Sequence, residues 1–198
     1  MIHPRAAFLR LLEVLDRLEI PYMVAGSAAS STYGISRATA DVDLVARLTR
    51  EDADALVNAL ESEFYIDAGE VRDAISRNRA FNVIHLGSSF KFDIFVLTDD
   101  GYQQMQFSRR RWTVSAVFGG DPIEFAVSAP EDLILSKLRW YRQGGEVSER
   151  QWNDVLSVVS VQRQILDLDY LSTWARYLGV DDLLEAALRE PHEPRGWK

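Results

Sequence analysis

Two aspartates alternate with apolar residues in one short segment, 41–46, and this alternation constrains what the chain can fold into. Asp41 and Asp43 are two residues apart, and Val42 and Leu44 follow them in turn. On a strand, successive side chains point to opposite faces, so the two carboxylates share one face and the apolar residues occupy the other. The pair predicts a strand of a sheet. Because like charges repel, it also predicts a compensating divalent cation such as Mg²⁺.

A third aspartate interrupts a second apolar segment, 90–97. Asp93 shares one face of the expected strand with Lys91 and Phe95. If this strand is a neighbour of 41–46, three carboxylates converge, and such a cluster can hold two metal ions about 3.5 to 4 Å apart. The alternative for each aspartate taken singly is a solvent-facing strand residue.

Gly26 and Ser27 stand between an expected strand at 22–25 and an expected helix at 27–33. Backbone N–H groups at the start of a helix favour an anion, so this turn is a candidate phosphate-binding site. The alternative is an ordinary turn, in which glycine and serine are common. The phosphate site is favoured because a short helix of small residues and then the two aspartates follow.

The remaining sequence divides by its hydrophobic period into a mixed region and a helical one. We predict an α/β (α+β) fold with a mixed-sheet core over 1–128 and a C-terminal helical bundle, packed on the core, over 129–198. The expected helices are 4–18, 51–60 with Thr49 as N-cap, 71–77, two from the stripes 133–141 and 152–159, 170–178 and 181–188; the other expected strands are 64–66, 81–86 (antiparallel to 90–97), and the antiparallel pair 112–118 and 123–127.

Composition excludes several classes of protein and site. The chain has no cysteine, which excludes disulfides, thiolate zinc sites and a cysteine nucleophile. A net charge of -8 argues against broad binding to DNA or anionic lipid. The start lacks the apolar run of a secretory signal, and no apolar stretch is long enough to cross a bilayer. We therefore expect a cytoplasmic protein that does not associate with membranes.

The Gly-Ser turn and the two aspartates together resemble a known signature. Residues 24–29 and 33–45 resemble the Gly-Ser, spacer, Asp-x-Asp motif of the DNA polymerase beta-like nucleotidyltransferase superfamily. The form Arg37-x-Thr39-x-Asp-x-Asp is similar to the branch that contains AbiEii-type toxins and small lincosamide and aminoglycoside adenylyltransferases. The resemblance implies a mixed-sheet nucleotidyltransferase fold. It also implies that Ser27 contacts a triphosphate, that Asp41 and Asp43 hold Mg²⁺ or Mn²⁺, and that Asp93 completes the site and can act as base.

Two helical segments extend the resemblance. Residues 129–138 and 150–155 are similar to the lysine helix and the Arg-x-x-x-Asp helix of the same branch. By that resemblance Lys137 neutralises phosphate charge, and Asp154 orients it or the nucleotide. Without the resemblance, Lys137 reads as an ordinary surface lysine.

Several other residues have two interpretations. Arg37 and Thr39 either bind phosphate or ribose or belong to a solvated loop. The run 109–111, three arginines, either docks a polyanionic acceptor such as an RNA end or forms a solvated face, which we favour. His85 is expected to be a packed residue with one hydrogen bond. The tryptophans at 112, 140, 152 and 174 are expected in the core rather than as base-stacking platforms.

These features predict an enzyme of the EC 2.7.7 type. It would transfer a nucleoside monophosphate from an NTP, such as ATP, to an acceptor that is a small molecule, a protein or an RNA end, and would release pyrophosphate. A toxin-like member would also have a partner protein. One alternative is a non-catalytic module on the same fold that binds a nucleotide or a partner. Another is a metal-dependent phosphohydrolase, which we favour less because the order turn, helix, strand suits transfer better.

Overall fold

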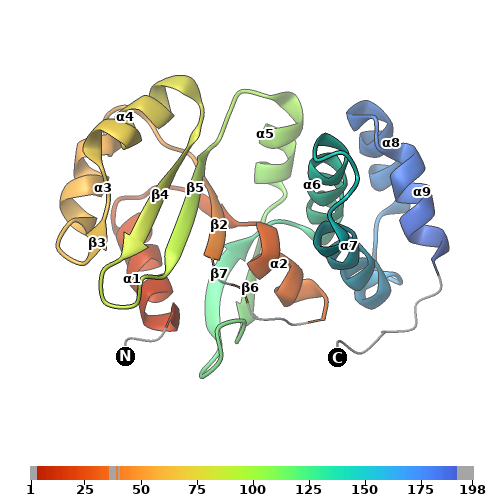
Figure 1. Ribbon diagram of the computed structural model, residues 1–198, viewed down its shortest axis with the longest axis horizontal. Helices are drawn as coiled ribbons and strands as arrows, with labels where there is room; N and C mark the ends of the chain where they lie inside the picture. Colours follow the sequence, from red (N-terminus) through yellow and green to blue (C-terminus); the bar gives the residue numbers. More distant parts are fainter. Residues whose placement is uncertain (1–3, 36–38, 40, 191–198) are drawn as a thin grey trace. The chain divides into compact units, whose positions relative to one another are not determined.

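The computed structural model describes residues 4–35, 39 and 41–190 (Figure 1). By their contacts, the described residues form two compact units. One lies within 1–28 and 38–127 and contains the sheet; the other lies within 29–37 and 128–198 and is helical. Each unit is described below by itself.

In the described part of the first unit, seven strands form one mixed sheet in the order β3-β4-β5-β2-β1-β7-β6. β2 pairs with β5 and β1 pairs with β7 in parallel, and the other neighbours are antiparallel. The two predicted antiparallel pairs, β4–β5 and β6–β7, are thus confirmed. The strands are β1 Tyr22–Val24, β2 Asp41–Ala46, β3 Phe64–Tyr65, β4 Ala80–His85, β5 Lys91–Val96, β6 Arg111–Ser115 and β7 Ile123–Val127.

One face of this sheet is the main hydrophobic core. Helix α1 (Pro4–Arg17) buries Phe8 there, and its ring lies 6.4 Å from that of Phe92 on β5 and 5.5 Å from that of Phe125 on β7. Helices α3 (Asp52–Leu60) and α4 (Ala68–Arg77) continue the layer, since α1 contacts α3 and α3 contacts α4. The buried residues of β2 and β5, every second one along each strand, point to this side, which leaves Asp41, Asp43 and Asp93 on the other.

The other face is covered in part by helix α5 (Gly101–Ser108). Its residue Phe107 packs in a small cluster with Met23, Leu97 and Val45. The sequence pattern did not predict α5, because its side chains carry little helical periodicity. What starts the helix is a cap: the Asp100 carboxylate accepts a hydrogen bond from the backbone N of Gln103 at 2.9 Å.

The N-cap predicted for the third helix is wrong. Helix α3 begins at Asp52, the cap position is Glu51, and no side chain caps the helix there. Thr49 instead donates from its backbone N and its hydroxyl to the carboxylate of Asp52, at 2.7 and 2.8 Å. These two bonds to the Asp52 carboxylate close the turn that precedes the helix.

The second unit is a bundle of four helices among the described residues, joined by the last part of helix α2 (Gly26–Tyr33). Helix α6 contacts α7, α8 and α9. Past the end of α2, the Ile35 N donates to the Ser157 hydroxyl at 2.6 Å, and the Gln162 side chain donates to the Tyr33 carbonyl at 2.7 Å. The bundle helices are α6 Pro130–Gln143, α7 Glu149–Gln162, α8 Leu168–Leu178 and α9 Asp181–Arg189.

The expectation that the tryptophans are core residues is wrong for two of them. Trp112 is 60% exposed and Trp140 is 58% exposed. Trp112 lies on β6, an edge strand, where Tyr22 packs edge-on against it, at 6.3 Å between ring centroids. Trp152 and Trp174 are half-buried. An apolar residue on an edge strand or an outer helix face does not have to be buried, because the sequence period does not reveal which faces are covered.

Over the ranges that the structure describes, no helix combines the length and the apolar character needed to cross a bilayer.

Candidate functional site

The acidic residues of β2 and β5 lie side by side on one face of the sheet. The two strands are parallel neighbours, with Asp43 opposite Asp93 and Asp41 opposite Lys91. Burial alternates along both strands: every second residue is buried, and the residues between them, which include the three aspartates, are partly exposed. The convergence expected from the sequence is therefore found, because the third acid is on the same face as the first two and in register with the second.

Lys91 lies among these carboxylates. Its Nζ is 2.7 Å from Oδ2 of Asp93 and 3.9 Å from Oδ2 of Asp41. The pKa of Lys91 is raised, chiefly by the hydrogen bond to Asp93. Burial works in the opposite direction, and the charges of Asp93, Asp41 and Asp43 raise the pKa further. All three acids thus act on the same ammonium.

The Gly-Ser turn lies directly against this cluster. β1 ends at Val24, helix α2 begins at Gly26, and Ala25 N donates to the Asp43 carbonyl at 2.8 Å. Gly26 has a φ of +56°, and a Cβ on it would lie 1.8 Å from Oδ2 of Asp43. Only glycine fits here, because both the backbone conformation and the approach of the carboxylate exclude a side chain.

Ser27 is the second residue of α2 and is buried. The first turn of a helix leaves backbone N–H groups without intrahelical partners, and these attract an anion. The Asp43 side chain reaches this helix start, so the predicted phosphate-binding turn and the predicted metal ligand are neighbours within the first unit.

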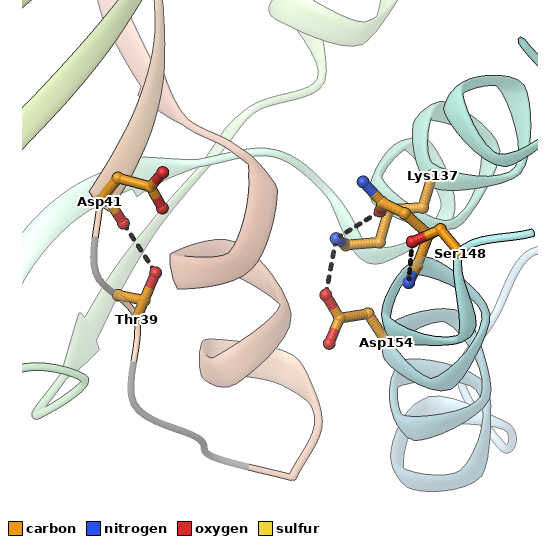
Figure 2. Close-up of polar contacts among 6 residues, drawn as sticks. Thr39, Asp41, Lys137, Ser148 and Asp154 are labelled. Atoms are coloured by element: carbon orange, nitrogen blue, oxygen red, sulfur yellow. Dashed lines mark hydrogen bonds and ion pairs between the residues drawn. The ribbon is translucent and has the colours of Figure 1, made fainter. Parts of the chain in front are cut away.

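Of Arg37 and Thr39, the two candidate residues that precede the aspartates, the structure describes Thr39. Thr39 donates from its hydroxyl to the backbone carbonyl of Asp41 at 2.7 Å (Figure 2). This bond occupies the hydroxyl proton and holds the chain as it enters β2. Arg37 lies outside the described residues.

In the second unit, Lys137 and Asp154 form a buried ion pair. Lys137 Nζ on α6 is 2.8 Å from Oδ2 of Asp154 on α7 and 3.1 Å from Oε1 of Gln151 (Figure 2). Both charged residues are 4% exposed. Lys137 is therefore not the surface lysine that its sequence context alone suggests. A buried ammonium requires a partner such as this carboxylate.

The comparisons with known proteins give a structural result only. No model of a protein family matches the chain, and no curated protein matches its sequence. Solved structures resemble it over most of both chains. Among them is an antigenic nucleotidyltransferase-like protein from Paracoccidioides brasiliensis, with a TM-score of 0.52, 18% identity, and 92% of this chain and 91% of that chain covered. Another is ANT(2")-Ia in complex with adenylyl-2"-tobramycin, with a TM-score of 0.55, 12% identity, and 88% and 95% covered.

The chain has a nucleotidyltransferase fold. The fold that the Gly-Ser and Asp-x-Asp motifs imply is thus found, and the two structures cover 92% and 88% of this chain. At these identities the likeness establishes the fold and assigns no role to any residue. The narrower likeness to AbiEii-type toxins stays an expectation.

The acidic cluster of this nucleotidyltransferase fold has the chemistry that a divalent cation requires. Carboxylate oxygens are the ligands that Mg²⁺ prefers, and three carboxylates share one face beside the start of a helix. The chain's own ammonium, paired with Asp93 and near Asp41, shows that this position attracts positive charge. As the side chains stand, no group of three or more His, Asp or Glu within the described residues is placed to hold a metal ion. Carboxylates are the kind of ligand that such a cation uses, and in this structure the contact with Asp93 is made by Lys91.

His85 and Arg110, two further residues considered in the sequence, both pack against neighbouring residues. His85 is buried, and its Nδ1 accepts from Ser88 N at 3.1 Å and lies 2.9 Å from the Ser88 hydroxyl, as expected for a packed histidine. Arg110, in contrast, is not simply solvated. Its guanidinium lies 4.4 Å from the Phe107 ring centroid, and its pKa is lowered by burial and by the nearby charge of Arg47.

Lys91 is the residue of the site whose part the sequence did not predict. Its position was expected on the Asp93 face, but no role was expected for it. The signal that could have shown it was the spacing itself, because a lysine two residues before an aspartate on a strand shares its face. Whether its ammonium reaches that aspartate depends on the rotamers of both side chains, which the spacing does not determine.

Proposed function

We propose that this protein is a nucleotidyltransferase that requires a divalent cation, Mg²⁺ or Mn²⁺, and transfers a nucleoside monophosphate from an NTP to an acceptor. The observation that supports it is the pairing of Asp43 with Asp93, on the face that also carries Asp41 and against the helix start at Gly26 and Ser27. Carboxylates next to an anion-receptive turn can bind a metal ion and a triphosphate together.

The proposed reaction forms one bond and breaks one. The acceptor oxygen or nitrogen bonds to the α-phosphorus of the NTP, and the bond from that phosphorus to the oxygen bridging to the β-phosphate breaks, so pyrophosphate leaves. Asp93 takes the proton of the acceptor. Ser27 and the first backbone N–H groups of α2 hold the triphosphate. When bound by Asp41, Asp43 and Asp93, the cation would supply charge neutralisation for the attacking and leaving groups.

The proposal extends to Lys137 and Asp154 as nucleotide-binding residues of the second unit, Lys137 for phosphate and Asp154 to orient it. What supports this is the resemblance of the two helical segments, together with the burial of both charges in a pair. A buried pair contributes little net stability compared with an apolar pair of the same size. Stability alone therefore does not explain why Lys137 and Asp154 are buried as a pair, and we propose a functional reason. Thr39, and Arg37 outside the described residues, are also proposed as nucleotide-binding residues.

The acceptor is sought with a panel of compounds. One structural neighbour, ANT(2")-Ia, is in complex with adenylyl-2"-tobramycin, so an aminoglycoside such as tobramycin belongs in the panel. An RNA with a free 3' end, a small hydroxyl compound and the protein itself, tested for self-modification, complete it. Each of the four NTPs, labelled at the α-phosphate, is offered with Mg²⁺ and separately with Mn²⁺.

The decisive variant is Asp43→Asn, with Asp54→Asn as the matched control. Asp43→Asn keeps the size of the side chain and removes a charge from the cluster, so we expect transfer of label to fall at least about a hundredfold. Because a repulsion is also removed, the melting temperature should stay the same or rise. Asp54 is exposed and pairs with Arg72, away from the cluster, and Asp54→Asn should keep full activity. Transfer that survives in Asp43→Asn would remove the assignment.

A second candidate function is a nucleotide-binding or partner-binding module without turnover. The observation that favours it is the Lys91 ammonium, which gives the acids a positive charge from the chain itself. In that case NTP binding would be measurable, would survive removal of divalent metal with EDTA, and no labelled product would form with any acceptor.

A further inference from the structure

Lys91 occupies a position that a metal ion would also favour. Its ammonium is bonded to Asp93 at 2.7 Å and lies 3.9 Å from Asp41, and the charge of Asp43 acts on it as well. A single positive charge therefore compensates part of a cluster of three negative ones. A second cation arriving at the same oxygens would be repelled by this ammonium and would have to replace its bond to Asp93.

We propose that Lys91 serves as an internal counter-ion: its ammonium compensates the negative charge of Asp93 and Asp41 before metal arrives and is displaced from Asp93 when the divalent cation binds. This inference rests on the proposed function, since it concerns the same carboxylates. It assigns a role to a residue that the sequence motifs do not identify.

The exposure of Lys91 allows this exchange. The Lys91 side chain is 40% exposed, whereas that of Lys137 is only 5% exposed. A lysine side chain is long and flexible, and at a partly exposed site its ammonium can move into water without losing its hydration. An ion pair at such a site is weak, so a divalent cation with several carboxylate ligands can compete with it. The buried pair of Lys137 has no comparable exit.

Competition by Lys91 makes the binding of metal depend on the nucleotide. A free metal ion must overcome the Lys91–Asp93 pair with the help of the carboxylates alone. A metal ion that arrives with a triphosphate brings negative charge with it, and the displaced ammonium then has a further anion nearby to interact with. Lys91 therefore disfavours metal in the empty site and disfavours it less when an NTP is present.

The first test measures Mn²⁺ binding to the full chain without nucleotide, by the electron paramagnetic resonance signal of free Mn²⁺. We expect Lys91→Met to lower the Kd for Mn²⁺ by roughly three- to tenfold, because it removes both the competing pair and a repelling charge. Lys91→Arg keeps the charge and should stay within about twofold of the wild type. Arg72→Met is the matched control, since it removes one positive charge from an exposed ion pair of the same unit, and it should leave the Kd unchanged.

The outcomes divide clearly. Tighter binding in Lys91→Met alone supports the counter-ion role. Unchanged binding overturns it. Weaker binding also overturns it, because it would mean that Lys91 only keeps the carboxylates in place as a structural element. Equal tightening in Arg72→Met overturns it too, since the effect would then come from net charge.

A second measurement follows the Lys91 side chain of the wild type directly. The chain contains three lysines, Lys91, Lys137 and Lys198, so selective ¹³C and ¹⁵N labelling of lysine gives a simple side-chain spectrum. Lys91→Arg identifies the Lys91 signal by its loss. On addition of Mg²⁺ to the wild type, the Lys91 signal should shift with a saturating dependence, and the Lys198 signal should not. A Lys91 signal that stays in place at a Mg²⁺ concentration that saturates the site overturns the proposal.

Failure of this inference is distinguishable from failure of the proposed function. If the wild type binds Mn²⁺, loses that binding in Asp43→Asn and transfers nucleotide, while Lys91→Met changes nothing, only the role of Lys91 is overturned. If neither the wild type nor Lys91→Met binds Mn²⁺ and no transfer is found, both are overturned.

Discussion

Gly26 and Asp43 show how a single turn depends on a side chain from the neighbouring strand. The turn needs a residue that accepts a positive φ and leaves room for a carboxylate, and glycine meets both conditions. The contact is reciprocal, because the space left by Gly26 is where the Asp43 carboxylate lies. The motif glycine is thus explained by the position of the motif aspartate.

Replacing Gly26 tests this dependence. Gly26→Ala would place a methyl group 1.8 Å from the Asp43 carboxylate, at a φ that costs alanine roughly 1 kcal/mol by itself. We expect a loss of at least about 2 kcal/mol in the free energy of unfolding, with a displaced Asp43 and reduced transfer. Urea unfolding measures the first effect and the labelled-NTP assay the second.

Gly101→Ala is the control for that variant. Nothing lies within 4 Å of a Cβ at Gly101, and its φ is not positive. The substitution should be neutral or stabilise by up to about 1 kcal/mol. Equal behaviour of the two alanine variants would show that the contact between Gly26 and Asp43 is not a constraint.

Tyr22 offers a residue-scale test of pH dependence. Its phenol is buried, which raises its pKa above the usual value, and the charge of Asp16 adds to the rise. Above about pH 10 the unfolded chain loses this proton while the folded protein retains it, so the unfolded state is favoured. The contribution is fully present below pH 10 and declines as the pH rises from there.

We therefore expect the wild type to lose stability relative to Tyr22→Phe at high pH. The difference should grow by about 1.4 kcal/mol per pH unit above about pH 10. Urea unfolding at pH 8, 10 and 11 measures it. Tyr65→Phe, which alters an exposed tyrosine, is the control. A constant difference between wild type and Tyr22→Phe across this range would contradict the argument.

At the scale of elements, the sequence predicted those with a strong hydrophobic period and missed one that begins with a cap. The strand at 41–46 is found with the predicted bounds, and β4 and β5 are the predicted antiparallel pair. Helix α5 was missed because Gln103, Gln104 and Gln106 give it no apolar stripe, and what begins it is the side chain of Asp100. Hydrophobic periodicity therefore predicts elements that bury one face. A polar helix that begins with a cap can be recognised only from its tertiary contacts.

The site was predictable to a similar extent. Strand alternation placed Asp41 and Asp43 on one face in advance, and Asp93 was expected to join them if its strand was a neighbour. The structure adds that the two strands are neighbours in register. The contacts of Lys91 with Asp93 and of Lys137 with Asp154 were beyond reach of the pattern, because rotamers and the packing of α6 on α7 decide them. Strand alternation predicts the face to which a side chain points, whereas the tertiary structure determines which residue it contacts.

A cap on helix α4 tests the same idea in a helix that was predicted only in part. The Asp67 carboxylate accepts from Glu70 N at 2.8 Å, and Asn78 ends the helix with a left-handed conformation. Asp67→Ala should lower the free energy of unfolding by about 1 kcal/mol, and Asp67→Ser should recover most of that loss because serine also caps. Thermal unfolding of both variants measures this, and equal melting temperatures for the two would argue against the cap.

At the scale of the whole molecule, the order of the elements along the chain does not follow the division into units. The first unit is interrupted after residue 28 and resumes at 38, and the second takes up both the intervening segment and everything from 128. A single boundary near 128, as the change of hydrophobic period suggests, does not reveal the short excursion. A change in hydrophobic period indicates where a long helical or strand-rich region begins. A segment of a few residues is too short to show a hydrophobic period of its own.

That excursion limits how the gene can be divided. Helix α2 begins at Gly26, beside the acids, yet the groups that satisfy its far end come from α7: Ser157 receives a hydrogen bond from Ile35, and Gln162 gives one to Tyr33. A fragment that stops at Val127 would contain all the strands of the described residues, but the far end of α2 would lose these two hydrogen-bond partners. A single recombination breakpoint near residue 128 therefore does not separate the two units. An exchange of the helical bundle between homologues must also include residues 29–37.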